Sequence, residues 1–197
     1  MVDELLTFWF GSSTDAAAVA KEKSSLWWSK NPAIDAEIRQ RFERLIGRAA
    51  AGELHEWQTS PRGRLALILL TDQFPRNIYR DSPDAFAYDP KALSWCLGGI
   101  EQALDLKLRP IERVFFYLPL EHAESLECQD RSVEQFRELL DAADAARKDV
   151  FKEYFDFAVR HRDIIARFGR FPHRNKILGR PSTSEELVFL NEPGSSF

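Results

Sequence analysis

Two short segments combine arginine, histidine and asparagine in a way that suits the binding of an anion. Residues 74–77 read FPRN and residues 171–175 read FPHRN, and we call them the first and second Phe-Pro corners. In each corner a proline follows an aromatic residue and is expected to stop a helix near exposed carbonyls of its last turn. Guanidinium groups hold carboxylates and phosphates in a forked geometry. The candidate ligand-binding residues are Asp72, Arg76, Asn77, Arg80, Arg170, Arg174 and Asn175.

The alternative for each corner is purely structural, because cations are favoured at the negative end of a helix dipole and would cap it there. Asp72 has a similar ambiguity. It continues the apolar stripe of residues 65, 68 and 69, so its carboxylate is expected inside the protein and needs a partner. Arg76, one helical turn further on, is the nearest candidate. We favour a structural Asp72–Arg76 pair over a poised acid or base.

Four residues could supply proton-transfer chemistry, namely Glu121, His122, His161 and His173. Glu121 and His122 follow Pro119 and are expected in the first turn of a helix, where acids also favour the dipole. His161 falls on an apolar stripe, where a neutral, hydrogen-bonded histidine is the usual outcome. Imidazole and carboxyl groups beside an arginine-bound anion would nevertheless suit general acid and base catalysis in a hydrolase or transferase.

Several other kinds of site are not supported by the sequence. There is no HExxH, no ExxH and no paired cysteine spacing, and neither phosphate-binding glycine pattern occurs, so we predict no metal and no cofactor. His122 and Ser125 lack a nucleophile elbow around the serine. Asp156, Arg160 and Asp163 lie three or four residues apart on one helix, with Arg167 completing the series, which predicts a solvated face.

Composition predicts a globular protein with a single domain over residues 1–197. The chain is 44% hydrophobic and 12% aromatic, which is enough for a sizeable core. A formal charge of −4 with mixed signs gives no field that would attract nucleic acid or a membrane. Two cysteines and an acidic N-terminal stretch without a signal-peptide pattern favour a cytoplasmic location. A protein partner remains open.

Helix signals dominate the chain, and no hairpin turn signal occurs. A capping residue followed by proline recurs at residues 31–32, 60–61, 82–83 and 89–90. Proline at 75 is expected to end a central helix that begins at residue 61 and is apolar on all sides from Leu65 to Leu70, and Pro119 is expected to interrupt another helix. The predicted helices cover residues 2–10, 15–28, 32–51, 61–74, 83–87, 90–104, 110–126 in two parts, 129–143, 144–168 and about 183–190. We predict an all-α fold of about nine helices in stacked antiparallel hairpins.

The longest motifs resemble one bacterial family. They are LALILLTDQFPRNIYR at 65–80, FYLPLEHAES at 116–125, RHRDIIARFGRFPHRN at 160–175 and the tail PGSSF. With Trp9-Phe10-Gly11 and the Trp27-Trp28 pair, they are similar to the bacterial domain-of-unknown-function 924 family over nearly the whole chain. The resemblance implies a right-handed, tetratricopeptide-repeat-like helical array, and it brings no established reaction or catalytic residue.

These observations lead to three hypotheses. The first is a protein whose concave face, lined by the two corners with Glu121, His122 and His161, binds a small anion or an acidic or C-terminal peptide. The second is an enzyme that uses the same pocket, which requires its histidines and carboxylates to lie within about 8 Å of each other. The third is an interaction scaffold, recognisable by a flat apolar groove without converging polar groups.

Overall fold

The computed structural model describes residues 1–196, and these residues form helices and connecting turns with no strand. The α-helices are α1 (Val2–Phe10), α2 (Ala16–Trp28), α3 (Pro32–Ala50), α4 (Pro61–Ile68), α5 (Phe74–Ile78), α6 (Asp89–Glu101), α7 (Pro110–His122), α8 (Leu126–Asp141), α9 (Lys148–Phe168) and α10 (Ser184–Phe189). Helices α4 and α5 are joined without a break by a π turn, Leu69–Gln73. If this joined rod is counted once, the described residues hold nine helical rods, so the all-α prediction is confirmed.

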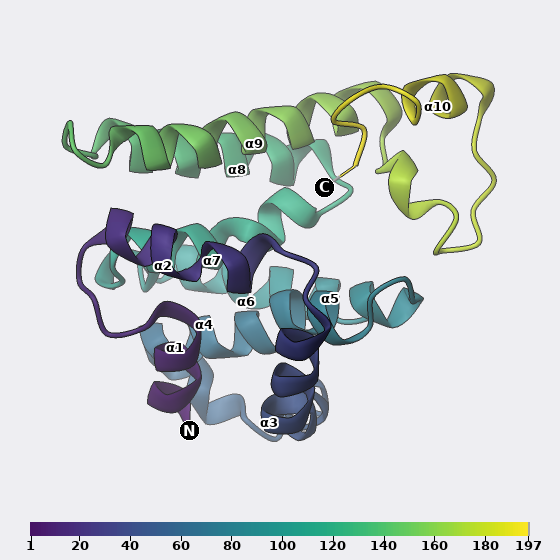
Figure 1. Ribbon diagram of the computed structural model, residues 1–197. Helices are drawn as coiled ribbons and strands as arrows, with labels where there is room; N and C mark the ends of the chain where they lie inside the picture. Colours follow the sequence, from purple (N-terminus) through teal and green to yellow (C-terminus); the bar gives the residue numbers. More distant parts are fainter. Residues whose placement is uncertain (197) are drawn as a thin grey trace.

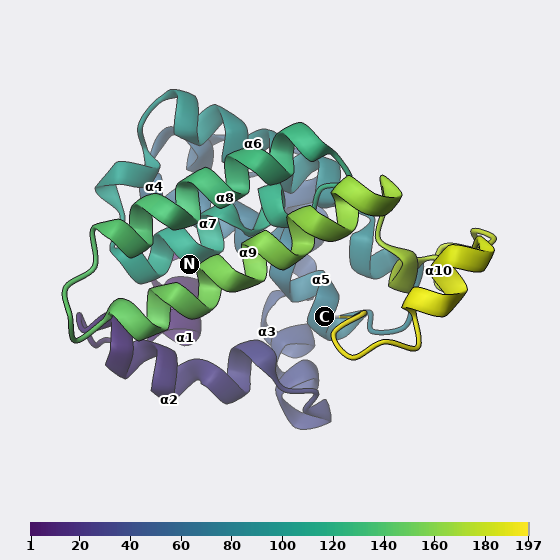
Figure 2. The same ribbon diagram turned by 90° about the horizontal axis from the view of Figure 1, so that it is seen from above.

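The helices stack in layers. Helices α8 and α9 lie side by side as a long antiparallel pair along one face of the molecule, and α7 runs beneath them (Figure 1). Below α7, the rod of α4 and α5 lies among α1, α3 and α6. Seen from above, α10 and the loops around it extend beyond the end of the α8–α9 pair (Figure 2). The right-handed, tetratricopeptide-like course of the array stays a prediction.

Helix α4 occupies the centre, as its uniformly apolar sequence predicts. Every residue from Leu65 to Leu70 is fully buried. A helix that is apolar on all sides must be covered on all sides, and α4 contacts α1, α6 and α7. The main hydrophobic core therefore surrounds this rod, and any polar residue on it is carried into the interior.

The C-terminal part packs around a smaller hydrophobic cluster of its own. Ile164 and Ile165 from α9, Phe171 and Phe189 form this cluster, with Phe168 packed against it. Helix α9 ends at Gly169, whose backbone adopts the left-handed conformation (φ 69°) expected of a glycine that stops a helix. A short 3₁₀ turn, Pro172–Arg174, follows and contains the second Phe-Pro corner.

Two predictions about proline are wrong. Pro75 does not end the central helix, because the π turn precedes it and the chain continues helically to Ile78. Pro119 does not interrupt its helix either, since α7 runs unbroken to His122. Proline removes one N–H donor at each place, and the tightly packed surroundings hold the helix together despite this loss. The expected ends of the other helices shift by only a few residues.

No helix within residues 1–196 combines the length and the apolar character needed to cross a membrane.

Candidate functional site

A buried ionic cluster forms where α5, the end of α7 and the second Phe-Pro corner meet. Its centre is Asp72, which is completely buried. The Oδ1 atom of Asp72 lies 2.7 Å from Nδ1 of His122 and 3.3 Å from Nη1 of Arg76. The Gln73 side-chain amide donates to the Asp72 Oδ2 atom at 2.6 Å. The predicted pairing of Asp72 with Arg76 is confirmed, and His122 is a second partner that the sequence did not indicate.

The π turn explains how Asp72 reaches this place. The Phe74 N–H donates to the Leu69 carbonyl, five residues back, where an α-helix would pair residues four apart. The wider turn absorbs one extra residue before Pro75, which has no N–H of its own. Thr71 donates its hydroxyl to the Leu67 carbonyl at 2.8 Å and satisfies part of the loosened backbone. Turns of this type occur often at functional sites.

Glu121 and His122 lie in the last turn of α7, and the prediction of a first turn is wrong. The carbonyls at this helix end have no further helical N–H groups to accept from. The side-chain amide of the fully buried Gln129 from α8 donates hydrogen bonds to them instead. Its Nε2 atom donates to the carbonyls of Glu121 at 2.7 Å and Ala123 at 2.8 Å. This contact fixes the backbone that carries both candidate acid–base groups.

Glu121 pairs with His161 from α9. The Glu121 Oε1 atom lies 3.2 Å from Nδ1 of His161, and both side chains are 6% exposed. The same Nδ1 atom lies 2.9 Å from the Phe157 carbonyl oxygen, which can only accept, so Nδ1 carries a hydrogen. The His161 ring centroid lies 6.4 Å from that of His122. The two carboxyl–histidine pairs are therefore neighbours, within the distance that the enzyme hypothesis requires.

The pKa values of the two carboxyl groups of the cluster, Asp72 and Glu121, are shifted in opposite directions. Burial alone would raise the pKa of Asp72, but the charge of Arg76 and the contact with His122 outweigh it and lower that pKa below its ordinary value. Burial, reinforced by the negative charge of Asp72, raises the pKa of Glu121 to about 8. At neutral pH Asp72 is a carboxylate and Glu121 a carboxylic acid.

The histidines of the cluster are neutral at pH 7. Burial lowers the pKa of His161 to about 3 and that of His173 to about 4. Burial and the nearby Arg76 charge also lower the pKa of His122. Because His161 and Glu121 are both uncharged, their 3.2 Å contact is not an ion pair.

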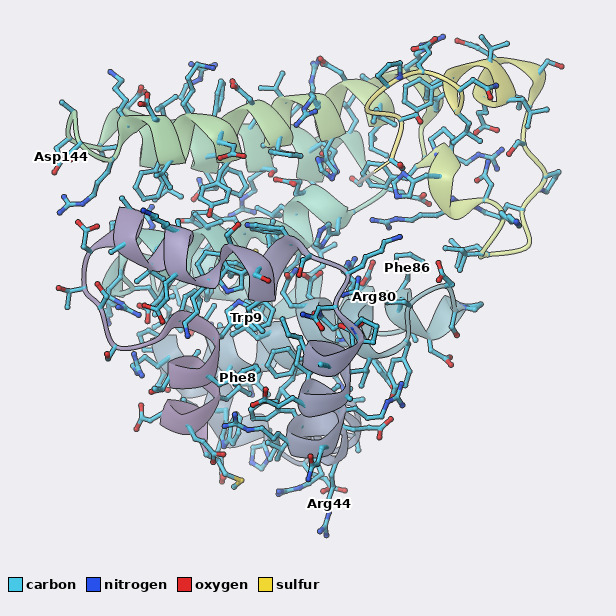
Figure 3. All side chains as sticks on the ribbon, in the orientation of Figure 1. Phe8, Trp9, Arg44, Arg80, Phe86 and Asp144 are labelled. Atoms are coloured by element: carbon cyan, nitrogen blue, oxygen red, sulfur yellow. The ribbon has the colours of Figure 1, made fainter. Side chains whose placement is uncertain are left out.

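Arg174 brings the second Phe-Pro corner to the cluster. Its guanidinium group lies over the rings of Phe86 (4.8 Å) and Phe171 (4.5 Å), and Figure 3 labels Phe86 on the segment below this corner. The Nη1 atom donates to the His122 carbonyl at 3.1 Å and lies 3.6 Å from Asp89. Burial lowers the pKa of Arg174 to about 10, so the group stays charged at neutral pH. Its buried Nε atom has no hydrogen-bond partner within residues 1–196.

The other three candidate arginines each hold a carboxylate of the protein in a forked pair. Arg76 donates to both oxygens of Asp89 at 2.8 and 2.9 Å. Arg80 binds Asp35 through Nε at 2.7 Å and Nη2 at 2.9 Å. Arg170 binds Glu186 through Nε at 2.6 Å and Nη2 at 2.8 Å. These carboxylates occupy the geometry that an anionic ligand would otherwise use.

The asparagines of the two corners join these structural pairs. Asn77 donates to Asp35 at 3.2 Å, beside Arg80. Asn175 donates to Ser182 and to Glu186, beside Arg170. The seven predicted ligand-binding residues therefore fall into three groups: Asp72, Arg76 and Arg174 lie in the ionic cluster, while Asn77 with Arg80 and Asn175 with Arg170 lie at separate ion pairs.

The two corners are not equivalent, although their sequences match. The first is helical, with Phe74 to Asn77 inside α5, and the second is a 3₁₀ turn after a helix has ended. The first corner contributes Arg76 to the cluster, and the second contributes Arg174 and His173. The repeated motif correctly indicated that two distant segments meet, but within residues 1–196 the arginines of the two corners do not all converge on one site, since Arg80 and Arg170 lie at separate ion pairs.

Several residues that complete the cluster were missed. Asp89 bridges the two corner arginines, and its position before Pro90 suggested only a helix cap. Glu124 accepts from the backbone N–H of Phe171 at 2.8 Å and from Arg180 at 2.6 and 2.9 Å, which ties the second corner to the start of α8. Glu124 lies within the quoted motif at 116–125, and that was the available signal.

Three open hollows of the surface lie away from the cluster. Their volumes are about 640 to 710 Å³, and they are lined by α1 to α3, by α3 with α5, and by one face of α9. The second of these hollows is lined by Asn77 and Arg80 together with their partner Asp35. No group of three or more potential ligand side chains within residues 1–196 could hold a metal ion. The face of α9 that carries Asp156, Arg160, Asp163 and Arg167 is exposed, as predicted.

The model of a family described as "Bacterial protein of unknown function (DUF924)" matches residues 5–194, and the chain belongs to this family. A solved structure described as a protein of unknown function, ATU0120 from Agrobacterium tumefaciens, is 36% identical. The similarity covers 90% of this chain and 99% of that chain, with a TM-score of 0.74. A search of curated protein sequences finds no match.

Proposed function

We propose that the buried ionic cluster binds a small anionic molecule and that Arg174 is its anchor. The observation that carries this proposal is the state of the Arg174 guanidinium group. It is 6% exposed. Within residues 1–196, its one salt bridge is the 3.6 Å contact with Asp89, and its Nε donor has no hydrogen-bond partner. A buried donor without a partner costs about 1 to 3 kcal/mol. A bound carboxylate or phosphate oxygen would remove this cost.

The contrast with the other arginines supports the choice. Arg76, Arg80 and Arg170 already hold carboxylates of the chain in forked pairs, and they position the backbone more than they recruit a ligand. Neutral histidines around Arg174 leave its positive charge available to an incoming anion. A small anion suits this place better than an extended peptide, because the surrounding side chains are almost fully buried. The convergence of polar groups also favours binding over an interaction scaffold. A protein partner and a cytoplasmic location stay predictions.

Thermal unfolding in the presence of a defined panel of anions tests the proposal. The panel contains acetate, oxalate, citrate, phosphate and sulfate, each compared at matched ionic strength. A bound anion at 100 times its Kd stabilises a protein by roughly 2.7 kcal/mol, which raises the unfolding midpoint of a chain of this size by roughly 5 to 10 °C. We expect such a rise with one or more compounds in the unaltered protein.

Arg174→Met should abolish the rise, and Arg174→Lys should reduce it because lysine lacks the planar fork. The matched control is Arg162→Met, since Arg162 is a half-exposed arginine on α9 that pairs at the surface with Asp130. It should keep the full response. If no anion stabilises the unaltered protein, or if Arg174→Met responds equally, Arg174 is not an anion anchor and the proposal is wrong.

A further inference from the structure

The ionic cluster contains both halves of an acid–base catalyst beside the anion anchor. Among its side chains are a carboxylate, a carboxylic acid and neutral imidazoles. We propose that the cluster catalyses proton transfer on its bound anion, with His122 as the base and Glu121 as the acid. This inference rests on the proposed function, since it needs an anion held by Arg174.

The Asp72–His122 pair defines the base. Asp72 is fully buried, and its Oδ1 atom lies 2.7 Å from Nδ1 of His122. Because a carboxylate only accepts, the hydrogen of the neutral imidazole lies on Nδ1. The opposite nitrogen, Nε2, then carries a lone pair. Arg76 and Gln73 hold both oxygens of Asp72, so the carboxylate orients the ring in the way that buried aspartates orient catalytic histidines.

The Glu121–His161 pair defines the acid. The hydrogen on Nδ1 of His161 is engaged by the Phe157 carbonyl at 2.9 Å and approached by Glu121 Oε1 at 3.2 Å. A second ionised carboxyl here would be buried and close to the charge of Asp72, and the charge of Arg160 offsets these two effects only in part. Burial and that charge keep the pKa of Glu121 above neutral pH. Two carboxyl groups held in opposite protonation states are the arrangement that assigns acid and base roles.

The arrangement in space allows both groups to act on one molecule. His122 is the most exposed of the four members of the two pairs, at 14% of its side chain. Arg174 donates to the backbone carbonyl of His122 itself, which fixes the anchor next to the base. The rings of His122 and His161 lie 6.4 Å apart. Arg174 therefore adjoins the Asp72–His122 pair, and the Glu121–His161 pair lies one imidazole ring further on.

The substrate class that fits is a small carboxylate with an adjacent enolisable carbonyl, that is, a 2-oxo acid. Its carboxylate would bind Arg174. The C–H bond next to the carbonyl breaks, its proton moves to Nε2 of His122, and its electron pair forms the C=C bond of the enol. The carbonyl oxygen takes the proton of Glu121. Return of a proton to carbon and to Glu121 restores the starting state, and no oxidant, reductant or nucleophile is consumed.

Hydrogen–deuterium exchange into 2-oxo acids tests the inference. Pyruvate, 2-oxobutyrate and 2-oxoglutarate are incubated with the protein in deuterium oxide, and loss of the C–H signals next to the carbonyl is followed by proton NMR. We expect exchange of one or more of them above the buffer rate. His122→Gln and Glu121→Gln should each reduce it at least about 100-fold. The matched control is His55→Gln, which removes an exposed histidine of the 3₁₀ turn before α4 and should leave the rate unchanged.

Binding and catalysis are separated by repeating the thermal unfolding experiment on the same variants with the same 2-oxo acids. His122→Gln and Glu121→Gln should keep the stabilisation by the anion, because Arg174 is intact. Binding without exchange would overturn this inference and leave the anion site standing. Absence of any stabilisation would overturn the proposed function itself.

A spectroscopic measurement tests the assignment of the base without any substrate. Nitrogen-15 NMR of the histidine side chains at pH 7 should show His122 and His161 as neutral rings protonated on Nδ1. Asp72→Asn should change the tautomer of His122 and lower the exchange rate without abolishing anion binding. An Nε2-protonated or positively charged His122 in the unaltered protein would remove the base and refute the assignment.

Discussion

Replacing Glu121 by glutamine should change how the stability of the protein depends on pH. The folded chain holds this carboxyl with a pKa of about 8, raised first by burial and then by the charge of Asp72, whereas the ordinary value is 4.5. Between these two values the folded state keeps a proton that the unfolded state has lost. The free energy of unfolding therefore falls as pH rises through this window. Glutamine resembles the protonated acid and removes this contribution.

The expected size follows from the linkage. One proton bound by the folded state but not by the unfolded state changes the free energy of unfolding by about 1.4 kcal/mol per pH unit. From pH 5 to pH 8 the unaltered protein should lose roughly 4 kcal/mol relative to Glu121→Gln. His161 and His173 are buried, and their pKa values are lowered to about 3 and about 4. They have the opposite effect on the protein, because they decrease its free energy of unfolding as pH falls below about 6.5. Subtracting the curve of Glu121→Gln from that of the unaltered protein cancels the contribution of these two histidines.

Urea unfolding at unit intervals from pH 5 to pH 9 measures the difference. The matched control is Glu134→Gln, an exposed glutamate on α8, whose curve should run parallel to that of the unaltered protein. A difference curve that stays flat from pH 5 to pH 8 would show that Glu121 is ionised in the folded protein. The carboxylic acid of the proposed catalytic pair would then not exist at neutral pH.

Two further substitutions test the packing that positions the cluster. Gly99→Ala should destabilise the protein by about 1 to 3 kcal/mol in urea unfolding, because a Cβ atom there would lie 2.4 Å from Cζ of Phe116 where α6 meets α7. Gly47→Ala is its control and should stabilise by up to about 1 kcal/mol, since a Cβ there meets nothing within 4 Å; equal effects would contradict this packing. Arg180→Gln should release the forked pair with Glu124 and speed amide hydrogen exchange in residues 170–182, and unchanged exchange would show that the pair does not hold the second corner.

Local patterns were sufficient to predict the helices. The apolar run from Leu65 to Leu70 required a helix buried on all sides, and α4 is one. Capping residues followed by proline predicted the first residue of several helices, and Gly169 predicted the end of one. Prolines inside a helical segment were the exception. Its effect at Pro75 and Pro119 depended on whether surrounding helices could hold the chain in a helical course, and local sequence carries no information on that.

The sequence by itself determined the all-α fold, the family, and which residue types are available for chemistry, because these depend on periodicity and on motifs that are contiguous in the chain. It also placed Asp72 in the interior beside Arg76, since the two are one turn apart. Only the tertiary structure decided which arginines are paired with carboxylates of the chain. Arg76, Arg80 and Arg170 meet carboxylates 13, 45 and 16 residues away, and Arg174 does not hold one as closely. The pairing of His122 with Asp72 and of Glu121 with His161 likewise joins separate helices, so their protonation states follow from burial and contacts that only the folded chain creates.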